Sequence, residues 1–411
     1  MNRRHRIYWR ILRPVVELFL KIKFGYTFDR AQDLPEKYIV LSNHTTDFDP
    51  LFVAASFRQQ MYFVASEHIT RWKRFFPMID HLFAPIIRQK GTVAASTVIM
   101  ALRKIKEGSN VCIFAEGVRS WDGVTGPILP STGKVVKKAG CGLVTYKLTG
   151  GYFVSPNWSL TSNTRRGPIH GGPVGMYTAE EIAAMTVDEV NAIINRDLYE
   201  DAYERQLADP KPYRGKNLAE QLENLLFVCP ACGDRDTFHS HGNTVTCASC
   251  GLAMGYDTYG MLTGVPQKLL PHQTVRDLAA WQRRQVAEDA AAGMAYTAGD
   301  GTLSMVKKQQ ETLVAQGEIR MTPETLRCGD REIAMADISD MAITGRRALV
   351  FTAGKMYYEM IPAQGFNAIK FLYYYESVKK QEAQRLAAAE SAATGETYTV
   401  NMTKTDTKGE M

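Results

Sequence analysis

Residues 38 to 50 read Tyr-Ile-Val-Leu-Ser-Asn-His-Thr-Thr-Asp-Phe-Asp-Pro. The run begins with four apolar residues, which predict a short buried strand. Polar side chains follow at once, with His44 at the carboxyl end of the strand and Asp49 five residues later. An imidazole beside a carboxylate can act as a general base, because the carboxylate holds one ring nitrogen while the other accepts a proton. Asp47, three residues from His44, is an alternative partner for the ring.

A second polar turn follows another apolar run. The strand candidate Val111–Phe114 is followed by Ala-Glu-Gly-Val-Arg-Ser at positions 115 to 120. Ligands of open α/β sheets bind at the carboxyl ends of the strands, so this turn should lie on the same edge as His44. An arginine at that edge suits a phosphate group. The alternative is that Glu116 and Arg119 form an ion pair that only shapes the turn.

A third segment, residues 82 to 88, is apolar until it ends in Arg88. A guanidinium is costly to bury without an anion, which favours a ligand-binding role for this arginine, with a structural ion pair as the alternative. The surrounding sequence alternates β-rich runs such as Leu143–Tyr146 with helical stretches such as Val93–Glu107. We therefore predict an α/β domain over residues 25–177, with a mixed sheet and flanking helices.

These three motifs, in this order, resemble the glycerolipid acyltransferases, specifically the 1-acyl-glycerol-3-phosphate acyltransferase family. The first signature of that family, Asn-His-x-x-x-x-Asp, matches Asn43, His44 and Asp49. The second, an apolar run ending in arginine, matches the segment that ends at Arg88. The third, Phe-Pro-Glu-Gly-Thr-Arg-Ser, matches Phe114, Glu116, Gly117, Arg119 and Ser120 and departs at Ala115 and Val118. The proline of the fourth signature is missing near residues 144–146.

The resemblance implies O-acyl transfer from an acyl thioester, either acyl-CoA or acyl-carrier protein, to the free hydroxyl of 1-acylglycerol 3-phosphate. The product would be phosphatidic acid. It implies that His44 removes the hydroxyl proton and that Asp49 orients and supports the imidazole. It assigns substrate binding to Arg88, Glu116, Gly117, Arg119 and Ser120, although Ser120 could equally cap a turn. Another lysophospholipid or glycerol 3-phosphate is an alternative acceptor.

The cysteine spacing predicts a metal site. Cys229-Pro-Ala-Cys232-Gly and Cys247-Ala-Ser-Cys250-Gly are two pairs with 14 residues between them. Four thiolates suit a tetrahedral zinc ion, and the glycine after each pair allows a tight turn. We predict a closed, structural zinc site in a zinc ribbon over residues 227–256. The alternatives are His239 or His241 as a substitute ligand, an iron centre, or two redox pairs.

A ribbon of this kind raises a second class of function, a scaffold protein with a catalytically degenerate acyltransferase domain. The segment between the two cysteine pairs contains one arginine and no lysine, which is a poor footprint for nucleic-acid phosphates. We therefore expect no nucleic-acid partner, whereas a protein partner for the ribbon stays open.

The positive charge of the chain is concentrated at its N-terminus. The formal net charge is +6, and seven basic residues against Glu17 in residues 1–24 account for all of it. Bulky apolar residues lie between the charges, as in a basic helix that lies in a membrane interface. We predict such a helix over residues 1–24, with peripheral or monotopic attachment at the cytoplasmic face. The alternative is a helix packed on the domain with its basic edge in solvent. We expect no transmembrane span and no signal peptide, because charged residues and Pro14 interrupt the apolar runs.

The whole chain has 411 residues, of which 45% are apolar; this fits two to three globular domains and excludes a wholly disordered chain. The predicted parts are a helical extension at 178–226, a helical linker at 272–292, a β-rich domain with a C-terminal helix at 300–391, and a disordered tail at 392–411. The element order of the β-rich domain resembles that of pleckstrin-homology-like domains.

Overall fold

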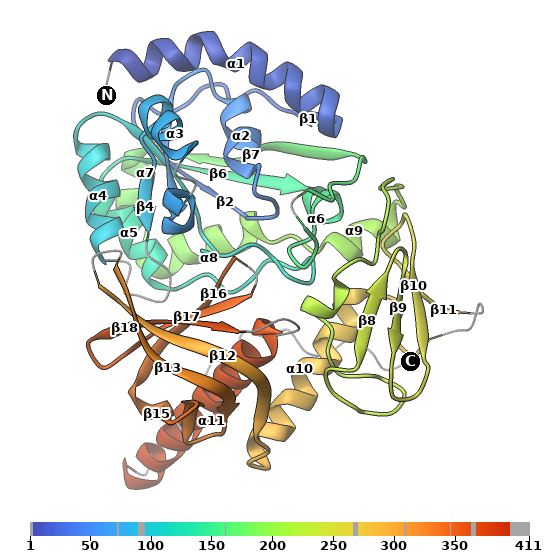
Figure 1. Ribbon diagram of the computed structural model, residues 1–411. Helices are drawn as coiled ribbons and strands as arrows, with labels where there is room; N and C mark the ends of the chain where they lie inside the picture. The colour runs from blue at the N-terminus through green and yellow to red at the C-terminus, as the bar shows by residue number, and fades with distance from the viewer. Residues whose placement is uncertain are drawn as a thin grey trace.

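The computed structural model describes residues 3–71, 74–88, 95–160, 162–265, 270–307, 310–345, 347–362 and 367–394 (Figure 1). Its N-terminal half contains a seven-stranded sheet in the order β1-β7-β6-β2-β5-β3-β4. These strands are β1 (Tyr26–Phe28), β2 (Tyr38–Ser42), β3 (Met61–Ser66), β4 (Ile86–Arg88), β5 (Asn110–Phe114), β6 (Gly142–Thr149) and β7 (Ile169–Tyr177). Neighbouring strands are parallel except β6 and β7, so the sheet is mixed, as predicted.

Helices cover both faces of this sheet (Figure 1). They are α1 (Arg3–Phe24), α2 (Asp49–Ser56), α3 (Phe76–Phe83), α4 (Ala95–Lys106), α5 (Ser131–Ala139), α6 (Gly151–Val154), α7 (Ala179–Ala184), α8 (Val187–Leu198) and α9 (Ala202–Ala208), with 3-10 turns η1 (Glu67–Arg71) and η2 (Leu222–Asn224). The central strand β2 has no exposed residue. Tyr38 and Val40 enter the core shared with α1 and α2, while Ile39 and Leu41 enter the core beneath α4, α5 and α8. A strand buried on both faces needs the continuous apolar run seen in the sequence.

The parallel pairing of β2 and β5 creates the edge on which the polar turns meet. Ser42 lies opposite Phe114 across this pair, and opposite Tyr146 of β6 on the other side. The chain leaves β2 and β5 at the same end of the sheet. The segments that follow, one leading to α2 and one to α5, therefore begin side by side.

Helix α1 packs along one side of the domain (Figure 1). Its buried side chains include Trp9, Leu20 and Phe24, and the Trp9 indole donates to the Phe57 carbonyl oxygen at 3.2 Å. The opposite face of α1 exposes large apolar side chains. Among the described helices, none is both long and apolar enough to cross a bilayer.

The C-terminal half begins with a small antiparallel sheet in the order β11-β10-β9-β8. Its strands are β8 (Phe238–His241), β9 (Thr244–Cys247), β10 (Ala253–Tyr256) and β11 (Leu262–Gly264). Helix α10 (Val275–Ala291) follows it and lies between this sheet and the last unit of the chain (Figure 1).

That last unit is an antiparallel sheet in the order β15-β14-β13-β12-β18-β17-β16, on which the long helix α11 (Ala368–Thr394) packs. Its elements are β12 (Tyr296–Lys307), β13 (Gln310–Met321), β14 (Thr325–Cys328), β15 (Arg331–Ala334), η3 (Met335–Asp337), β16 (Ile338–Thr344), β17 (Ala348–Ala353) and β18 (Met356–Pro362). The first strand thus joins the second and the seventh, which brings both ends of the strand series into one sheet.

One hydrophobic core runs through all of these units. It extends from Phe24 and the α2 face of the first sheet, through Phe227, Val245 of the small sheet and Leu278 of α10, to Phe371 of α11. The C-terminal units therefore pack against the first domain instead of being joined to it only by the chain.

Some element boundaries differ from the sequence predictions. The apolar run 82–88 is divided, because Ala84 takes a left-handed backbone (φ 42°) between the end of α3 and β4. The small sheet continues to Gly264, past the predicted end of the ribbon at 256. Helix α11 takes in the first three residues of the predicted tail, and residues 395–411 lie outside the described part. Residues 93 and 94 of the predicted helix 93–107 also lie outside it.

Candidate active site

His44 and Asp49 form a hydrogen-bonded pair at the carboxyl end of β2. The His44 Nδ1 atom lies 2.9 Å from Asp49 Oδ2. The Asp49 side chain is fully buried, whereas that of His44 is 20% exposed. Because a carboxylate only accepts hydrogen bonds, this contact places the ring proton on Nδ1 and leaves Nε2 as the proton-accepting nitrogen.

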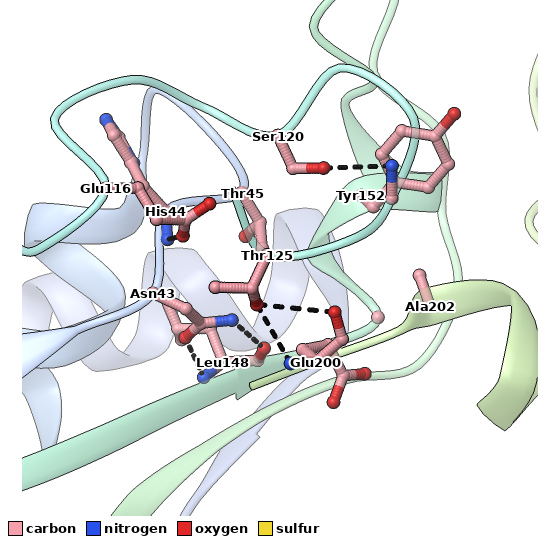
Figure 2. Close-up of a pocket in the computed structure, with 12 residues that line it drawn as sticks. Asn43, His44, Thr45, Glu116, Ser120, Thr125, Leu148, Tyr152, Glu200 and Ala202 are labelled. Atoms are coloured by element: carbon pink, nitrogen blue, oxygen red, sulfur yellow. Dashed lines mark hydrogen bonds between the residues drawn. The ribbon is translucent and has the colours of Figure 1, made fainter. Parts of the chain in front are cut away.

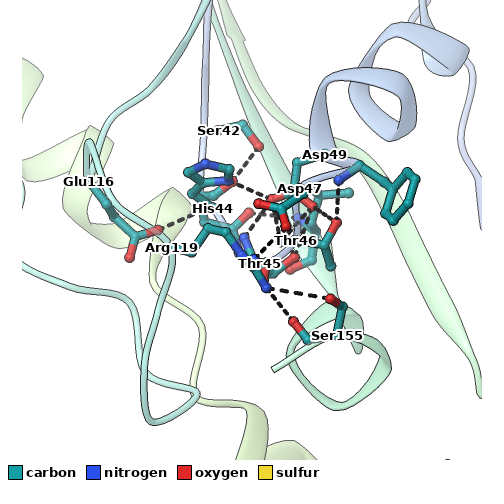
Figure 3. A network of polar contacts seen from close by, with 12 residues as sticks. Ser42, His44, Thr45, Thr46, Asp47, Asp49, Glu116, Arg119 and Ser155 are labelled. Atoms are coloured by element: carbon teal, nitrogen blue, oxygen red, sulfur yellow. Dashed lines mark hydrogen bonds and ion pairs between the residues drawn. The ribbon is translucent and has the colours of Figure 1, made fainter. Parts of the chain in front are cut away.

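The Asp49 carboxylate is held by the chain that separates it from His44 (Figure 3). The backbone N–H groups of Thr45 and Thr46 donate to it, and so does the Thr46 hydroxyl at 2.7 Å. Asp49 is also the first residue of α2, with Pro50 behind it, where a negative charge and a proline both favour helix initiation. The carboxylate therefore orients the imidazole from a fixed position.

Asn43 explains how the chain leaves the sheet at this point. Its amide nitrogen donates to the Leu148 carbonyl oxygen and its amide oxygen accepts from the Leu148 N–H, both at 2.8 Å. The side chain thus takes over the pairing with β6 that a strand backbone would make, and the backbone is free to turn toward α2.

Asp47, the alternative partner, contacts Arg119 instead. The Arg119 Nη1 atom lies 2.9 Å from Asp47 Oδ2. A three-residue spacing would favour Asp47 only on a regular helix, and residues 43–48 are not helical. The five-residue spacing reaches His44 because Asp49 stands where the turn ends and α2 begins.

Glu116 ties the two polar turns together (Figure 3). One of its carboxylate oxygens accepts from the His44 N–H at 2.7 Å, and the other accepts from the Gly126 N–H at 2.6 Å. Desolvation raises the pKa of Glu116 to about 8, although these two hydrogen bonds oppose the rise. Both oxygens are used by the backbone, so Glu116 shapes the site.

Arg119 and Ser120 are likewise engaged within the protein. The Arg119 guanidinium, 7% exposed, donates to the carbonyl oxygens of Thr45 and Ser155 in addition to pairing with Asp47. Ser120 donates its N–H to the His44 carbonyl oxygen at 3.0 Å. Its hydroxyl accepts from the Gly123 N–H at 2.9 Å, which is a turn-capping contact. Both residues hold the turn against the His44 segment.

Arg88 and Gly117 meet at the same turn. Gly117 has a φ of 71°, and a Cβ atom placed on it would lie 2.5 Å from the Arg88 Nη1 atom. Only glycine accommodates both the left-handed backbone and the close approach of the guanidinium. The Arg88 Nε atom is buried and has no hydrogen-bond partner among the described residues. A cation with an unused donor is thereby held beside the turn that contacts His44.

A small pocket opens beside His44 (Figure 2). Its lining comes from the His44 segment, the turn after β5, the end of β6, the start of α6 and the start of α9: Asn43, His44, Thr45, Glu116, Ser120, Gly123, Thr125, Leu148, Gly150, Tyr152, Glu200 and Ala202. Thr125, Tyr152 and Glu200 were not singled out in the sequence. Thr125 belongs to the loop after β5, whereas α6 and the start of α9 bring Tyr152 and Glu200 from more distant parts of the chain, and no local motif marks any of the three.

One comparison with known proteins covers the part of the chain that carries this site. Residues 26–149 match the family model described as Acyltransferase. This part of the chain belongs to the acyltransferase family. The matched segment contains His44, Asp49, Arg88 and the turn after β5, so the recognised domain is the one that carries the site.

Among solved structures, the chain is similar to the 1-acyl-sn-glycerophosphate (LPA) acyltransferase PlsC from Thermotoga maritima. The two share 16% sequence identity with a TM-score of 0.36, over 48% of this chain and 83% of the other. No curated protein sequence matches the chain significantly.

The four paired cysteines form a second candidate site. Their Sγ atoms all lie within 4.8 Å of one another, with Cys229 and Cys250 at 3.6 Å and Cys232 and Cys247 at 3.9 Å. A zinc ion with four bonds to sulfur of about 2.3 Å requires neighbouring sulfurs roughly 3.8 Å apart, whereas a disulfide requires about 2 Å. His239 and His241 are not part of the group found among the described residues.

The two cysteine pairs have the same backbone form. Gly233 and Gly251, which follow the pairs, have φ angles of 78° and 74°. The N–H of Gly233 donates to the Cys229 carbonyl oxygen, and that of Gly251 donates to the Cys247 carbonyl oxygen. Each pair is therefore a tight turn that directs two sulfurs to one point, and the geometry fits a four-sulfur metal site.

Proposed function

We propose that this acyltransferase moves an acyl chain from an acyl thioester, acyl-CoA or acyl-carrier protein, to the free hydroxyl of 1-acylglycerol 3-phosphate. The product is phosphatidic acid. The observation that carries the proposal is the His44–Asp49 pair beside the guanidinium of Arg88 at Gly117. It combines a base for a hydroxyl group with a cation for a phosphate on one edge of the sheet.

The reaction follows from the position of the proton on His44. Nε2 takes the hydroxyl proton of the acceptor as its oxygen attacks the thioester carbonyl carbon, and the buried Asp49 stabilises the resulting imidazolium. The tetrahedral intermediate collapses by breaking the carbon–sulfur bond. The proton on Nε2 then passes to the departing thiolate, so an ester and a free thiol are formed. This sequence needs no covalent acyl-enzyme.

Arg88 is the residue we propose to bind the acceptor phosphate. Guanidinium groups bind phosphate through charged hydrogen bonds, and Arg88 brings to the turn a buried Nε donor that has no partner among the described residues. Arg119 reaches an anion only by giving up Asp47. In this proposal Gly117 makes room for Arg88, while Glu116, Arg119 and Ser120 hold the turn.

Transfer assays with a matrix of donors and acceptors test this function. Acyl-CoA and acyl-carrier protein are each paired with 1-acylglycerol 3-phosphate, glycerol 3-phosphate, a lysophospholipid with a larger headgroup, and monoacylglycerol. We expect the highest kcat/KM for 1-acylglycerol 3-phosphate. A preference for another acceptor would replace the substrate assignment, and absence of transfer to every acceptor by the folded protein on vesicles would favour a non-catalytic scaffold.

Replacing Arg88 by methionine should raise the KM for phosphate-bearing acceptors by about 10- to 100-fold, because a hydrogen bond to a charged group contributes roughly 1.5–3 kcal/mol. We expect transfer to monoacylglycerol to be slow and to be unchanged by this substitution, since that acceptor has no phosphate. Arg103→Met is the matched control, because Arg103 is an exposed arginine paired with Glu107 on α4. An equal loss on both kinds of acceptor would contradict phosphate binding by Arg88.

We further propose that α1 rests on a membrane surface. Its exposed face carries Ile7, Ile11, Val15, Leu18 and Ile22, which are between 49% and 64% exposed. Their spacings of three and four residues place them on one side of the helix. Phe75 and Met78, at the neighbouring helix α3, are 58% and 55% exposed. The basic residues of α1 flank this apolar ridge, a pattern that suits anionic lipid.

The double substitution Ile11→Glu with Leu18→Glu should release the protein from vesicles of anionic phospholipid, lowering its partition coefficient at least about 100-fold. Removing residues 1–24 is a less clean test, because it also takes Leu20 and Phe24 out of the core. The controls are Leu207→Glu and Leu386→Glu, which change equally exposed leucines on α9 and α11. Unchanged vesicle binding by the double variant in a flotation assay would place the membrane contact elsewhere.

A further inference from the structure

We infer that Arg283, on helix α10 of the C-terminal half, is a positioning residue for the acyltransferase site. It holds the far end of the turn that carries Glu116, Arg119 and Ser120. The near end of this turn is fixed to the His44 segment by Glu116 and Ser120. Arg283 acts on the far end of the turn, residues 121–126. Its expected effect on kcat rests on the proposed acyl transfer.

One arginine of α10 contacts the far end of the turn directly, and a second contacts Asp201, whose backbone pairs with that end. The Arg283 Nη2 atom donates to Asp122 Oδ2 at 3.2 Å, and the other Asp122 oxygen accepts from the Val124 N–H at 3.2 Å. The Arg276 Nη1 atom donates to Asp201 Oδ2 at 2.7 Å. Arg276 and Arg283 are seven residues apart, close to two helical turns, so they extend from one face of α10.

Asp201 connects this contact to the same turn. Its backbone forms a β-bridge with Val124, and the next residue donates its N–H to the Gly123 carbonyl oxygen at 2.9 Å. The Thr125 N–H donates to the Glu200 carbonyl oxygen at 2.9 Å. Arg283 therefore holds residues 122–125 through Asp122, and Arg276 holds them through residues 200–202. Gly123 and Thr125 of this stretch line the pocket at His44.

Helix α10 is itself held by the segment that leads into the first cysteine pair, residues 225–228. The Gln282 side chain, fully buried, accepts from the N–H groups of Phe227 and Val228 at 2.7 and 3.0 Å and donates to the Leu225 carbonyl oxygen at 2.9 Å. Cys229, the first cysteine, follows Val228 directly. Arg283 is the residue after Gln282, so the hydrogen bonds that hold Gln282 also fix the backbone from which the Arg283 side chain extends.

Helix α11 completes the support from the other side. The Tyr373 hydroxyl lies 2.9 Å from Arg283 Nη2, and the guanidinium carbon lies 4.4 Å from the centre of the Tyr373 ring. A guanidinium stacked on an aromatic ring is restricted in its orientation. Arg283 therefore joins the first domain, α10 and α11 at one point.

Arg283 should affect the rate of acyl transfer more than the global stability of the protein. The Arg283 side chain is 46% exposed, and an ion pair of this kind contributes little to global stability. Small displacements of a reacting group can nevertheless slow turnover greatly. For Arg283→Met we expect kcat to fall by about 5- to 20-fold with the KM of the thioester within about twofold, because the bound geometry changes more than the binding sites do.

Amide hydrogen exchange tests the effect of the Arg283–Asp122 contact on the turn without any substrate. In Arg283→Met, the amides of Gly123 and Val124 should exchange about tenfold faster, since local opening becomes easier when an anchor is lost. Amides of β12 to β18 should keep their wild-type rates. Arg283→Lys should restore part of the protection and of kcat. Arg284→Met is the control, because Arg284 is the next residue of α10 and is exposed.

A double-mutant cycle with Asp122→Asn identifies the route. If Arg283 acts through Asp122, Arg283→Met should have little further effect on exchange or kcat in the Asp122→Asn protein. Unchanged exchange at residues 122–125 in Arg283→Met, an equally large effect in the Asp122→Asn background, or faster exchange throughout the molecule would overturn the inference. If the wild-type protein is inactive on every acceptor but its amides at residues 122–125 exchange slowly, and faster in Arg283→Met, the proposed function is contradicted. The role of Arg283 in holding the turn is then still supported.

Discussion

Replacement of His44 by alanine should lower kcat/KM for acyl transfer by about 10²- to 10⁴-fold while leaving the fold intact. Loss of a general base costs this much, and here no neighbouring group can replace it, because Glu116 and Asp49 are committed to backbone N–H groups. The His44 side chain is partly exposed, and its ring stacks on Phe114 at the edge of the core with 4.3 Å between the ring centres. The thermal midpoint should therefore stay within a few degrees of that of the wild type.

The measurement is steady-state transfer from acyl-CoA to the best acceptor, together with a thermal melt of the same preparation. His170→Ala is the matched control, since His170 also pairs with an aspartate, Asp29, but lies exposed on β7. Retention of more than a tenth of wild-type kcat/KM in His44→Ala would rule out His44 as the base. Loss of activity together with a large drop in the thermal midpoint would show a structural role instead.

Loss of the metal should be the most damaging change to stability. We propose that one zinc ion binds Cys229, Cys232, Cys247 and Cys250, and that its four thiolate bonds hold the small sheet in place. Cys229 and Cys247 are buried in the same core as Phe227 and Leu278. Structural zinc sites contribute folding free energy directly, so a Cys247→Ser variant should lose several kcal/mol and melt roughly 10 °C or more below the wild type.

Metal analysis and thiol titration of the purified protein check this prediction. We expect one zinc per wild-type chain, none in Cys247→Ser, and one in both His239→Ala and His241→Ala, whose imidazoles lie outside the sulfur cluster. Prolonged chelation should reproduce the drop in thermal midpoint. Iron in place of zinc would change the metal assignment. A disulfide within either pair, or full stability without metal, would overturn the site.

The parts of the site that lie close together in the sequence could be predicted from it. His44 and Asp49 are five residues apart, and the strand before them is a continuous apolar run. The contacts of Arg119 could not be predicted in the same way. A guanidinium suits phosphate in general, but the carbonyl oxygen of Ser155 that engages Arg119 lies 36 residues away and belongs to no motif.

The fold shows the same division. Strands β2, β5 and β6 are long apolar runs at the centre of the sheet, and the sequence predicts them. Strand β7 contains three glycines and Pro173, which lower strand propensity, and it pairs with β6 across a bulge. Strands β1 and β4 are only three residues long, too short for a periodic pattern. Their existence depends on the neighbours they pair with, β7 and β3.

The shared core has a consequence for how the chain is made. Leu20 and Phe24 are made well before Phe371 and Tyr374 of α11, which complete the core to which they belong. Domains usually fold as units while the chain is still growing. Here the apolar surface that the C-terminal units later cover stays exposed on the nascent acyltransferase domain until those units are made. The ridge of α1 is exposed in the complete fold as well, so its proposed contact with a membrane does not have to wait for α11.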